Sequence, residues 1–342
     1  IDRNESKRAL QVIDDLKEMI NGQRILIISS NLFGYQERIV GRLQYLGAQV
    51  VWLDGRPNNS FFTKVGMRYF PFFYKNLLIK YYKKSIKNTF DQILVISPEY
   101  LSVDIIHILK ERANARRLVL YMWDSFLNKK KVAGSIKYFD KVLTFDSDDA
   151  ERLNLFFRPL FFSSRNQDIK KNYNEIDISF IGTGHSDRAK ILEEIKRQCI
   201  NLNLKYYFYL YLQNKAIYYF HKITNKHYKN IKKSYFYFRH IEYDKYIKIS
   251  ENSKAIIDIE HPKQKGLTMR TFEVLGKEKK LITTNKDIRN YDFYNASNIL
   301  VIDRLNPVID KNFITTDYQQ LPMNIYYKYS IDGWLEDIFT FS

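Results

Sequence analysis

Short, unbroken apolar runs recur along the first half of the chain, and each is followed by a stretch with helical character. These runs cover residues 24–30 (RILIISS), 48–53, 92–96, 118–122 and 141–145. Continuous apolar runs of this length are typical of strands that helices cover on both faces. Strands that alternate with helices along the chain predict a parallel, doubly wound sheet.

A second series of the same kind begins at residues 177–181 (DISFI). Further apolar runs follow at 205–210, 255–259, 280–284 and 298–302, and a helix-like stretch covers about 325–339. Residues 161–174 between the two series are polar and lack apolar periodicity, as a linker should. We therefore predict an α/β chain with two Rossmann-like domains, at 1–165 and 176–322. Ligands of such sheets bind at the carboxyl ends of the strands, so a cleft between the domains is the expected site.

Composition limits the cellular compartments and the kinds of site that fit this chain. The 342 residues contain no apolar run of roughly 18, the length that spans a bilayer, and the charged segment 1–17 does not resemble a secretory signal. Cys199 is the one cysteine, which excludes an internal disulfide and a cysteine-based zinc site. We expect a cytoplasmic protein.

The formal net charge of +17 suits nucleic acid, anionic lipid or the phosphates of a nucleotide sugar. An AT-rich gene would produce the same excess of Lys, Asn, Ile, Tyr and Phe, so the bulk charge does not choose among partners. No helix-turn-helix, zinc-finger or RNP motif is present, and we predict no nucleic-acid partner.

The stretch 258–285 (DIEHPKQKGLTMRTFEVLGKEKKLITTN) is the most informative segment. A strand ends, a polar loop follows, and a helix begins near Thr268 and stops at Gly276. Backbone N–H groups at a helix start favour anions, so this segment suits a diphosphate, with Arg270 as a charged donor and Glu273 as a ligand of ribose hydroxyls. An ordinary strand-helix-strand crossover with solvated charges is the alternative.

A second candidate site is the segment 182–188 (GTGHSDR). Gly182 and Gly184 directly follow a strand, where they would let a donor phosphate approach the backbone. The segment is neither G-x-G-x-x-G nor a Walker motif, which excludes a dinucleotide or P-loop site. For Asp187 we expect helix capping alone.

Four blocks in order carry a family resemblance: 122–125 (MWDS), 143–162 (LTFDSDDAERLNLFFRPLFF), 177–188 (DISFIGTGHSDR) and 266–294 (GLTMRTFEVLGKEKKLITTNKDIRNYDFY). Together they resemble the GT-B glycosyltransferases of lipopolysaccharide and capsular-polysaccharide biosynthesis, and the last is related to a pattern of spore-maturation-type glycosyltransferases. The resemblance covers most of the chain.

The resemblance implies two Rossmann-like domains that face a cleft, with the acceptor on the N-terminal domain and a nucleotide sugar, UDP-linked in our reading, on the C-terminal one. It further implies that the terminal helix, residues 323–342 with Trp334, packs back across the domain junction. The acceptor would be a glycan or a lipid-linked glycan. No cofactor is implied, and no metal is required, since helix dipoles and basic side chains stabilise the leaving diphosphate in this family.

One position departs from the family pattern. The donor signature has glutamates at both ends of an E-x7-E spacing, whereas here Glu273 occupies the second end and Lys265 the first. This weakens the retaining mechanism and leaves Glu273 as a ribose ligand. A sugar-nucleotide epimerase of similar fold and a non-catalytic glycan-binding relative remain alternatives.

An inverting transfer needs a general base within reach of the acceptor hydroxyl. Glu99 and Asp124 follow strands of the N-terminal domain and fit this position best, while Asp146 suits capping of the next helix. His261, in the donor loop, is either a donor-site residue or a structural histidine.

The segment 61–88 mixes aromatic residues with Lys and Arg. It suits a contact with anionic lipid headgroups at the inner face of the cytoplasmic membrane, a groove for the acceptor, or core packing with exposed lysines. The similar segment 206–246 is predicted to serve mostly in packing.

Overall fold

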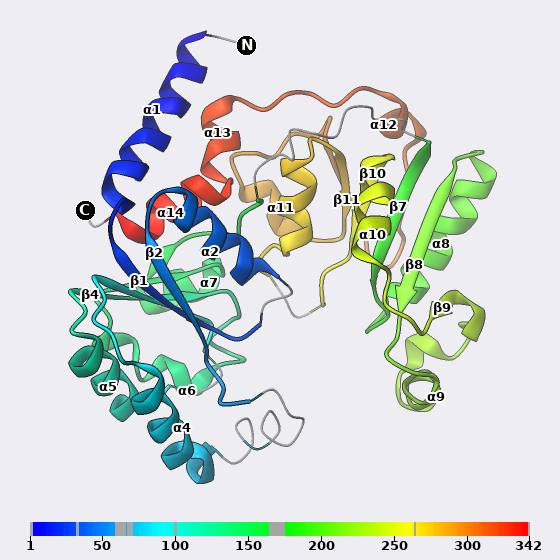
Figure 1. Cartoon of the computed structure of the whole chain (residues 1–342). Coiled ribbons are helices and arrows are strands. Elements are labelled where there is room, and N and C mark those ends of the chain that lie inside the picture. Colours follow the sequence, from blue (N-terminus) through cyan, green and yellow to red (C-terminus); the bar gives the residue numbers. More distant parts are fainter. Residues whose placement is uncertain are drawn as a thin grey trace. The chain divides into compact units, whose positions relative to one another are not determined.

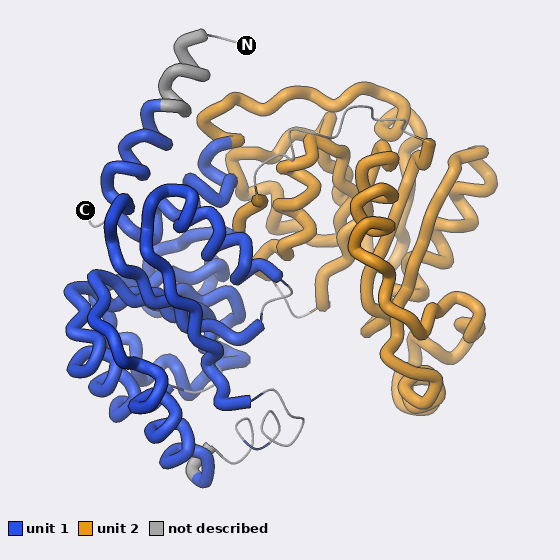
Figure 2. The backbone as a smooth tube through the Cα atoms, viewed as in Figure 1, with its two compact units in different colours: residues 1–160, 327–342 blue, residues 161–326 orange. Residues whose placement is uncertain are grey.

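The structure is a computed structural model that describes residues 3–31, 34–58, 66, 71–98, 101–163, 175–262 and 265–340 (Figure 1). It divides into two compact units, blue and orange in Figure 2. Unit 1 comprises Ile1–Leu160 and Tyr327–Ser342, and unit 2 comprises Phe161–Tyr326. The chain therefore leaves unit 1 once and returns to it for its last residues.

Unit 1 contains a sheet of six parallel strands in the order β2-β1-β3-β4-β5-β6. The strands are β1 (Arg24–Ser29), β2 (Gln49–Asp54), β3 (Gln92–Ile96), β4 (Arg117–Met122), β5 (Lys141–Thr144) and β6 (Phe156–Phe157). The helices include α1 (Arg3–Ile20), α2 (Tyr35–Tyr45), α4 (Pro71–Ser85), α5 (Val103–Ala113), α6 (Lys130–Ala133), η1 (Ile136–Tyr138), α7 (Ser147–Leu153) and α14 (Ile331–Phe339).

Helices cover both faces of this sheet. On one face, Leu78 of α4 and Ile105 of α5 pack into one core with Val95 of β3. Successive strand residues point to opposite faces. On the other face the ring of Tyr121 meets the fully buried Trp334 of α14, with centroids 4.9 Å apart. Burial on both sides explains why these strands are apolar without a break.

Unit 2 repeats the design with the order β12-β11-β10-β7-β8-β9, again all parallel. Its strands are β7 (Ile176–Thr183), β8 (Tyr206–Tyr211), β9 (Phe236–Tyr237), β10 (Ser253–Asp258), β11 (Lys280–Thr283) and β12 (Ile299–Val301). Its helices include α8 (Arg188–Asn201), α9 (Lys215–Thr224), η2 (Lys226–Tyr228), η3 (Lys233–Tyr235), α10 (Tyr243–Glu251), α11 (Met269–Gly276), η4 (Lys286–Asn290) and α12 (Lys311–Thr315). The chain returns to unit 1 within α13 (Met323–Lys328).

Two details differ from the sequence-based expectation. β2 is not buried on both faces, since Val51 and Trp52 are 43% and 38% exposed; it is the edge strand, with a neighbour on one side only. The single terminal helix expected at 325–339 is two helices, α13 and α14. They are separate because Ser330 is extended and its hydroxyl accepts a hydrogen bond from the Gly333 N–H at 3.2 Å, which starts a new helix.

Among the residues that the structure describes, no helix has both the length and the apolar character needed to cross a membrane.

Candidate functional site

The strand order of unit 2 reverses direction between β7 and β10. From β7 the chain continues outward to β8 and β9, and it then returns to β10, which pairs with the other side of β7. α8 packs in the core on one face of the sheet, whereas α10 and α11 line a pocket with β7 and β10 on the other. The loops after β7 and β10 therefore diverge at the carboxyl end of the sheet, where doubly wound sheets bind their ligands. We refer to this point as the unit-2 switch point.

Asp258 ties the end of β10 to the start of α11. Its carboxylate is 2% exposed and accepts hydrogen bonds from the hydroxyls of Thr268 at 2.5 Å and Thr271 at 2.8 Å. Thr268 stands at the N-cap position of α11, but its hydroxyl is bonded to Asp258 and does not cap the helix. The N-cap Thr268 and the first residues of α11, Met269 and Arg270, are half-buried, so the start of this helix is partly open to solvent at the strand ends.

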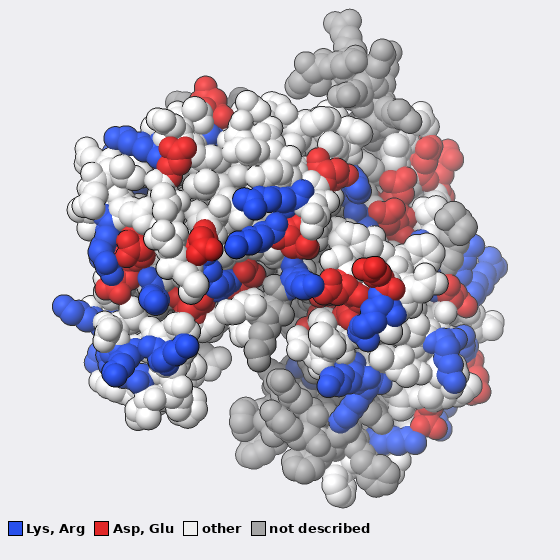
Figure 3. Space-filling view, turned by 180° about the vertical axis from the view of Figure 1, so that it is seen from behind, with Lys and Arg blue, Asp and Glu red and all other residues white. Residues whose placement is uncertain are grey.

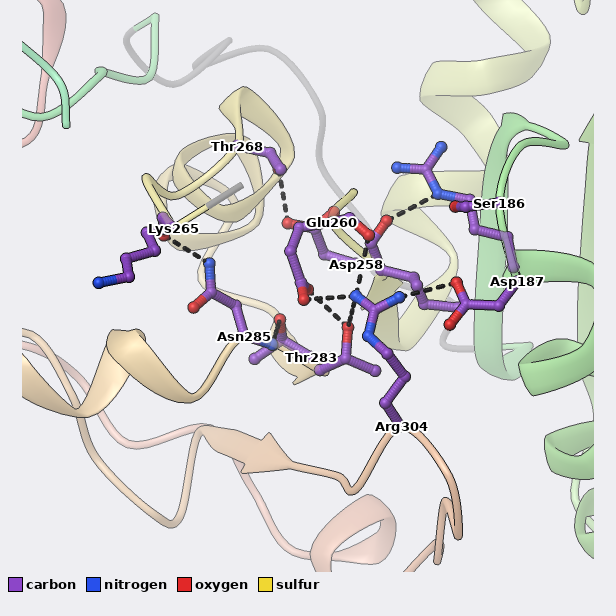
Figure 4. Close-up of polar contacts among 12 residues, drawn as sticks. Ser186, Asp187, Asp258, Glu260, Lys265, Thr268, Thr283, Asn285 and Arg304 are labelled. Carbon is purple, nitrogen blue, oxygen red and sulfur yellow. Dashed lines mark hydrogen bonds and ion pairs between the residues drawn. The ribbon is translucent and has the colours of Figure 1, made fainter. Parts of the chain in front are cut away.

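Arg304 joins the loops of three strands (Figure 4). One guanidinium nitrogen donates to Asp187 at 2.7 Å, and the other donates to the carbonyl of Glu260 at 2.9 Å and to its carboxylate. The hydroxyl of Thr284 lies 3.1 Å from the same nitrogen and donates to Glu260 at 2.5 Å. Burial disfavours the charged guanidinium, but the two carboxylates outweigh it and raise the pKa of Arg304.

The expectation that Asp187 only caps α8 is wrong. Asp187 occupies the N-cap position, yet its side chain makes no capping hydrogen bond and instead holds Arg304. A capping aspartate must turn its carboxylate toward the N–H groups in the first turn of its own helix. The guanidinium of Arg304 lies in another direction and is the stronger partner, because its hydrogen bond to Asp187 is charge-assisted.

Arg188 and Arg270 lie on either side of the unit-2 switch point. Both guanidinium groups lie near the ring of Phe180, at 5.8 and 5.2 Å from its centroid. Arg188 donates to the carbonyls of Ile259 at 2.7 Å and of Thr183 at 3.1 Å. Burial and, after it, the positive charge of Arg270 lower the pKa of Arg188 to about 10. The two cations are therefore close enough to repel each other.

Arg270 is the more accessible of this pair. Its side chain is 21% exposed, it donates to the carbonyl of Ile181, and a carboxylate oxygen of Asp258 lies 3.9 Å away. Asp258 also accepts two threonine hydroxyls, so it does not neutralise Arg270 at close range. The pair of arginines has the charge and the donors to hold an anion.

The two predicted glycines have clear packing reasons. A side chain at Gly182 would meet the Phe180 ring at 3.0 Å and the Arg270 guanidinium at 3.2 Å, and one at Gly184 would lie 2.6 Å from Phe236. The absence of a side chain at Gly182 is what lets Arg270 lie against β7. Their predicted contact with donor phosphates stays a prediction.

Glu273 lies one turn further along α11 and accepts a hydrogen bond from the hydroxyl of Tyr246 at 2.7 Å. Together with Arg270 and Lys277 these residues line a pocket between α10, α11 and the strands β7 and β10. Burial, followed by the charge of Glu273, raises the pKa of the Tyr246 hydroxyl, so this group stays protonated and donates to Glu273. Glu273 is thus oriented in the pocket that Arg270 also lines, where we predicted a ribose ligand.

The predicted residue His261 faces His185, with ring centroids 5.7 Å apart. His185 follows β7, and its Nδ1 lies 2.9 Å from the hydroxyl of Ser186. Burial, then the charges of Arg188 and His261, lower the pKa of His185 to about 4. His185 is therefore a neutral hydrogen-bonding group at the site.

Lys265, at the place of the first family glutamate, contributes its carbonyl to this network. The carbonyl accepts from the Asn285 amide at 2.8 Å, and in Figure 4 the lysine side chain points away from Arg304.

In unit 1, Asp124 follows the end of β4 by two residues, at a strand end as expected. It is half-buried and accepts from the Asn128 amide at 2.9 Å. Asp146 caps α7 as predicted, because its carboxylate accepts from the Asp149 N–H at 3.1 Å. Glu99 lies outside the described residues.

Sequence reasoning missed Arg304 and Tyr246 and left Arg188 without a role. Arg304 follows the apolar run at 298–302 by two residues, so its place just beyond a strand end was a usable signal. Tyr246 had none, since it is one of 27 tyrosines and its partner comes from another helix.

Comparison with known proteins establishes the fold. No family model matches the sequence, and no curated protein does either. A glycosyltransferase from Rickettsia africae ESF-5 has a similar structure, with a TM-score of 0.51 and 11% identity over 94% of this chain and 95% of the other. Anabaena Alr3699/HepE in complex with UDP and glucose is similar with a TM-score of 0.50 and 11% identity over 92% and 95%. The predicted GT-B fold, built from two Rossmann-like parallel-sheet domains, is confirmed.

Proposed function

We propose that this protein is a glycosyltransferase that binds a nucleotide-sugar donor at the unit-2 switch point. The observation that carries the proposal is the pair formed by Arg188 and Arg270 around Phe180, next to the start of α11. A diphosphate there would relieve the repulsion between the two cations and would meet the positive end of the helix. One protein of this fold, HepE, is known in complex with UDP and glucose, which supports UDP as the nucleotide.

The rest of the donor follows from the same geometry. Glu273, oriented by Tyr246 in the pocket that Arg270 also lines, accepts hydrogen bonds from the ribose hydroxyls. Gly182, Gly184, His261 and Thr268 border the donor. Arginine side chains and the helix start meet the diphosphate charge, so we propose that no divalent ion is required. Chelation with EDTA should then leave UDP affinity unchanged.

The acceptor side belongs to unit 1 in this proposal. Asp124 or Glu99 takes the proton from the acceptor hydroxyl as it attacks the sugar, and the nucleoside diphosphate leaves with its charge held by Arg188 and Arg270. A glycan or lipid-linked glycan of bacterial surface-polysaccharide biosynthesis is the acceptor class that the sequence resemblance supports. The protein would then work in the cytoplasm, at the inner face of the membrane.

Titration of the protein with UDP tests the donor site. Arg270→Met removes the accessible cation, and we expect a loss of UDP affinity of about tenfold to a hundredfold, the range for a charge-assisted hydrogen bond. Arg270→Lys keeps the charge but not the planar guanidinium, so its UDP affinity should lie between those of wild type and Arg270→Met. Lys286→Met is the matched control, because it removes a positive charge near the same strand ends from a side chain that is 69% exposed and paired with Asp303. Equal UDP affinity in wild type and Arg270→Met would contradict the proposal.

Incubation of the enzyme with a UDP-sugar and no acceptor separates transfer from epimerisation. An epimerase converts its substrate at full rate without an acceptor, whereas a transferase releases UDP only slowly, to water. Rapid appearance of a second UDP-sugar would contradict the transferase assignment.

A further inference from the structure

The helix α9 of unit 2 carries an apolar stripe that faces away from the core. Tyr218, on its inner side, is 4% exposed and fills the unit-2 core. Tyr219, Phe220 and Ile223, on the outer side, are 53%, 62% and 86% exposed. Ile223 lies three positions after Phe220 and four after Tyr219, so the three side chains form one continuous stripe along the helix. Packing within unit 2 is already served by the opposite side of α9 and does not explain the stripe.

Basic residues surround this stripe and acidic residues are missing from it. The whole chain contains 38 Asp and Glu residues, yet residues 195–241 contain none. The exposed lysines on and after α9 are Lys215, Lys222, Lys226, Lys229, Lys232 and Lys233. In Figure 3 the part of unit 2 that contains α9 is at the lower left, and its lower tip shows blue and white atoms and no red. Gene composition that favours lysine would not remove aspartate and glutamate from one segment, so the charge here is a local feature.

We propose that α9 and the lysines that follow it form a docking surface for an anionic lipid bilayer. Phe220 and Ile223 would enter the boundary between headgroups and acyl chains, while the lysines would stay at the level of the lipid phosphates. An amphipathic helix with aromatic and aliphatic residues on one side and lysines beside it is the structure that binds such an interface in its plane. A second copy of this surface is a poor occupant, because it would bring two groups of lysines together. A nucleic acid would satisfy the lysines but would leave the apolar stripe without a partner.

The residues that follow α9 are hydrogen-bonded to the loop after β7, which belongs to the candidate site. Asn225, which ends α9, donates to the carbonyl of Ser186 at 3.0 Å, and Tyr228 donates to the carbonyl of Gly184 at 2.6 Å. Ser186 has a positive φ of 52°, a backbone conformation that needs such support from its surroundings. A bilayer bound at α9 would therefore lie against the same lobe that holds the loop after β7, which would bring a lipid-linked substrate to the donor site.

Sedimentation with lipid vesicles tests the surface without reference to the sugar chemistry. We expect the protein to bind vesicles that contain phosphatidylglycerol, to bind phosphatidylcholine vesicles weakly, and to be released by salt. The double variant Phe220→Ser with Ile223→Ser should bind the anionic vesicles about tenfold or more weakly, as loss of the inserted apolar area predicts. Both side chains are exposed, so the variant should keep the wild-type thermal stability and UDP affinity.

The matched control lies on α4 of unit 1, within the segment for which the sequence suggested membrane contact. Phe73 and Leu77 are 79% and 45% exposed. Phe73→Ser with Leu77→Ser should leave vesicle binding unchanged. If that variant loses binding while the α9 variant retains it, or if the α9 variant binds anionic vesicles as wild type does, the docking surface is wrongly placed. Equal loss of binding to a DNA duplex and to vesicles in the α9 variant would also overturn the choice of a bilayer.

Discussion

The two units share one sheet design but place different chemistry at their strand ends. In unit 2, three arginines and three carboxylates meet where the strand order reverses: Arg188, Arg270, Arg304, Asp187, Asp258 and Glu260. In unit 1 the order reverses between β1 and β3, and the serines at the ends of these two strands make neutral contacts. The hydroxyl of Ser29 accepts from the Trp52 indole at 2.9 Å, and the hydroxyl of Ser97 accepts from the Trp123 N–H at 2.9 Å.

The difference teaches that the parallel sheet supplies a location and the strand-end residues supply the chemistry. The arginines of unit 2 suit a charged diphosphate. In unit 1 the ring of Trp123 meets Tyr35 edge-on, with ring centroids 6.0 Å apart. Such a ring suits an uncharged, hydroxyl-rich molecule, and the adjacent Asp124 is the proposed proton acceptor. The proposed division between a donor side and an acceptor side can be tested by changing one unit at a time.

The largest effect is expected in unit 1, on rate alone. Asp124→Asn removes a carboxylate that we propose as the general base, and a general base contributes about a hundredfold to ten-thousandfold in rate. UDP release from the donor should fall by that factor while UDP affinity stays at the wild-type value. Glu99 is the alternative general base, and the variant Glu99→Gln is measured in the same way. If both variants keep the wild-type rate, or if either weakens UDP binding, the proposed division is wrong.

The next effect is a contrast between two ion pairs with the same exposure, 20% for the arginine and 8% for the carboxylate. Arg304 in unit 2 holds Glu260, and Arg42 in unit 1 holds Asp332 of α14. Replacing either arginine by alanine leaves a buried carboxylate without its partner, and we expect a loss of roughly 3 kcal/mol in the free energy of unfolding. Urea denaturation measures this loss.

UDP affinity should separate the same two variants. Arg304→Ala releases the loops after β7 and β10 and should weaken UDP binding, whereas Arg42→Ala should not change UDP binding under conditions in which both variants are folded. An effect of Arg42→Ala on UDP affinity as large as that of Arg304→Ala would remove the distinction between the units.

The smallest effect concerns pH and again belongs to unit 2. The pKa of His185 is about 4 in the folded protein, below its ordinary value of 6.5, because of burial and the nearby Arg188. Between these two values the unfolded chain binds a proton that the folded protein does not, so the free energy of unfolding should fall as the pH drops from about 6.5 to about 4. His185→Asn should reduce this slope. An unchanged slope in urea titrations across this range would show that His185 is not its source.

Much of the fold follows from local patterns. Each apolar run became a strand of a parallel sheet because burial on both faces selects such a sequence, and the helix from Met269 to Gly276 ends where the glycine predicted. The exposure of β2 was not predicted, because its edge position depends on the strand order of the sheet and not on the sequence of the strand. The two-residue strands β6 and β9 were missed because pairs of aromatic residues carry no periodicity.

The candidate site was predictable only in part. Arg270 and Glu273 share a helix whose start and end can be read from the sequence, so their place near a strand end followed. The contacts between separate segments could not be predicted. Tyr246 of α10 donates to Glu273 of α11, and Arg304 binds Asp187, which lies 117 positions earlier in the chain.

By itself, the sequence determined two parallel sheets, the strand that leads into each candidate segment, and the local excess of lysine around α9. The tertiary structure decided which charges meet. Asp187 binds an arginine instead of capping its helix, Gly182 makes room for Arg270, and one side of α9 is left exposed. The physical reason is that a strand or helix records its own burial in its periodicity, whereas an ion pair between loops depends on strand order, which no single segment encodes.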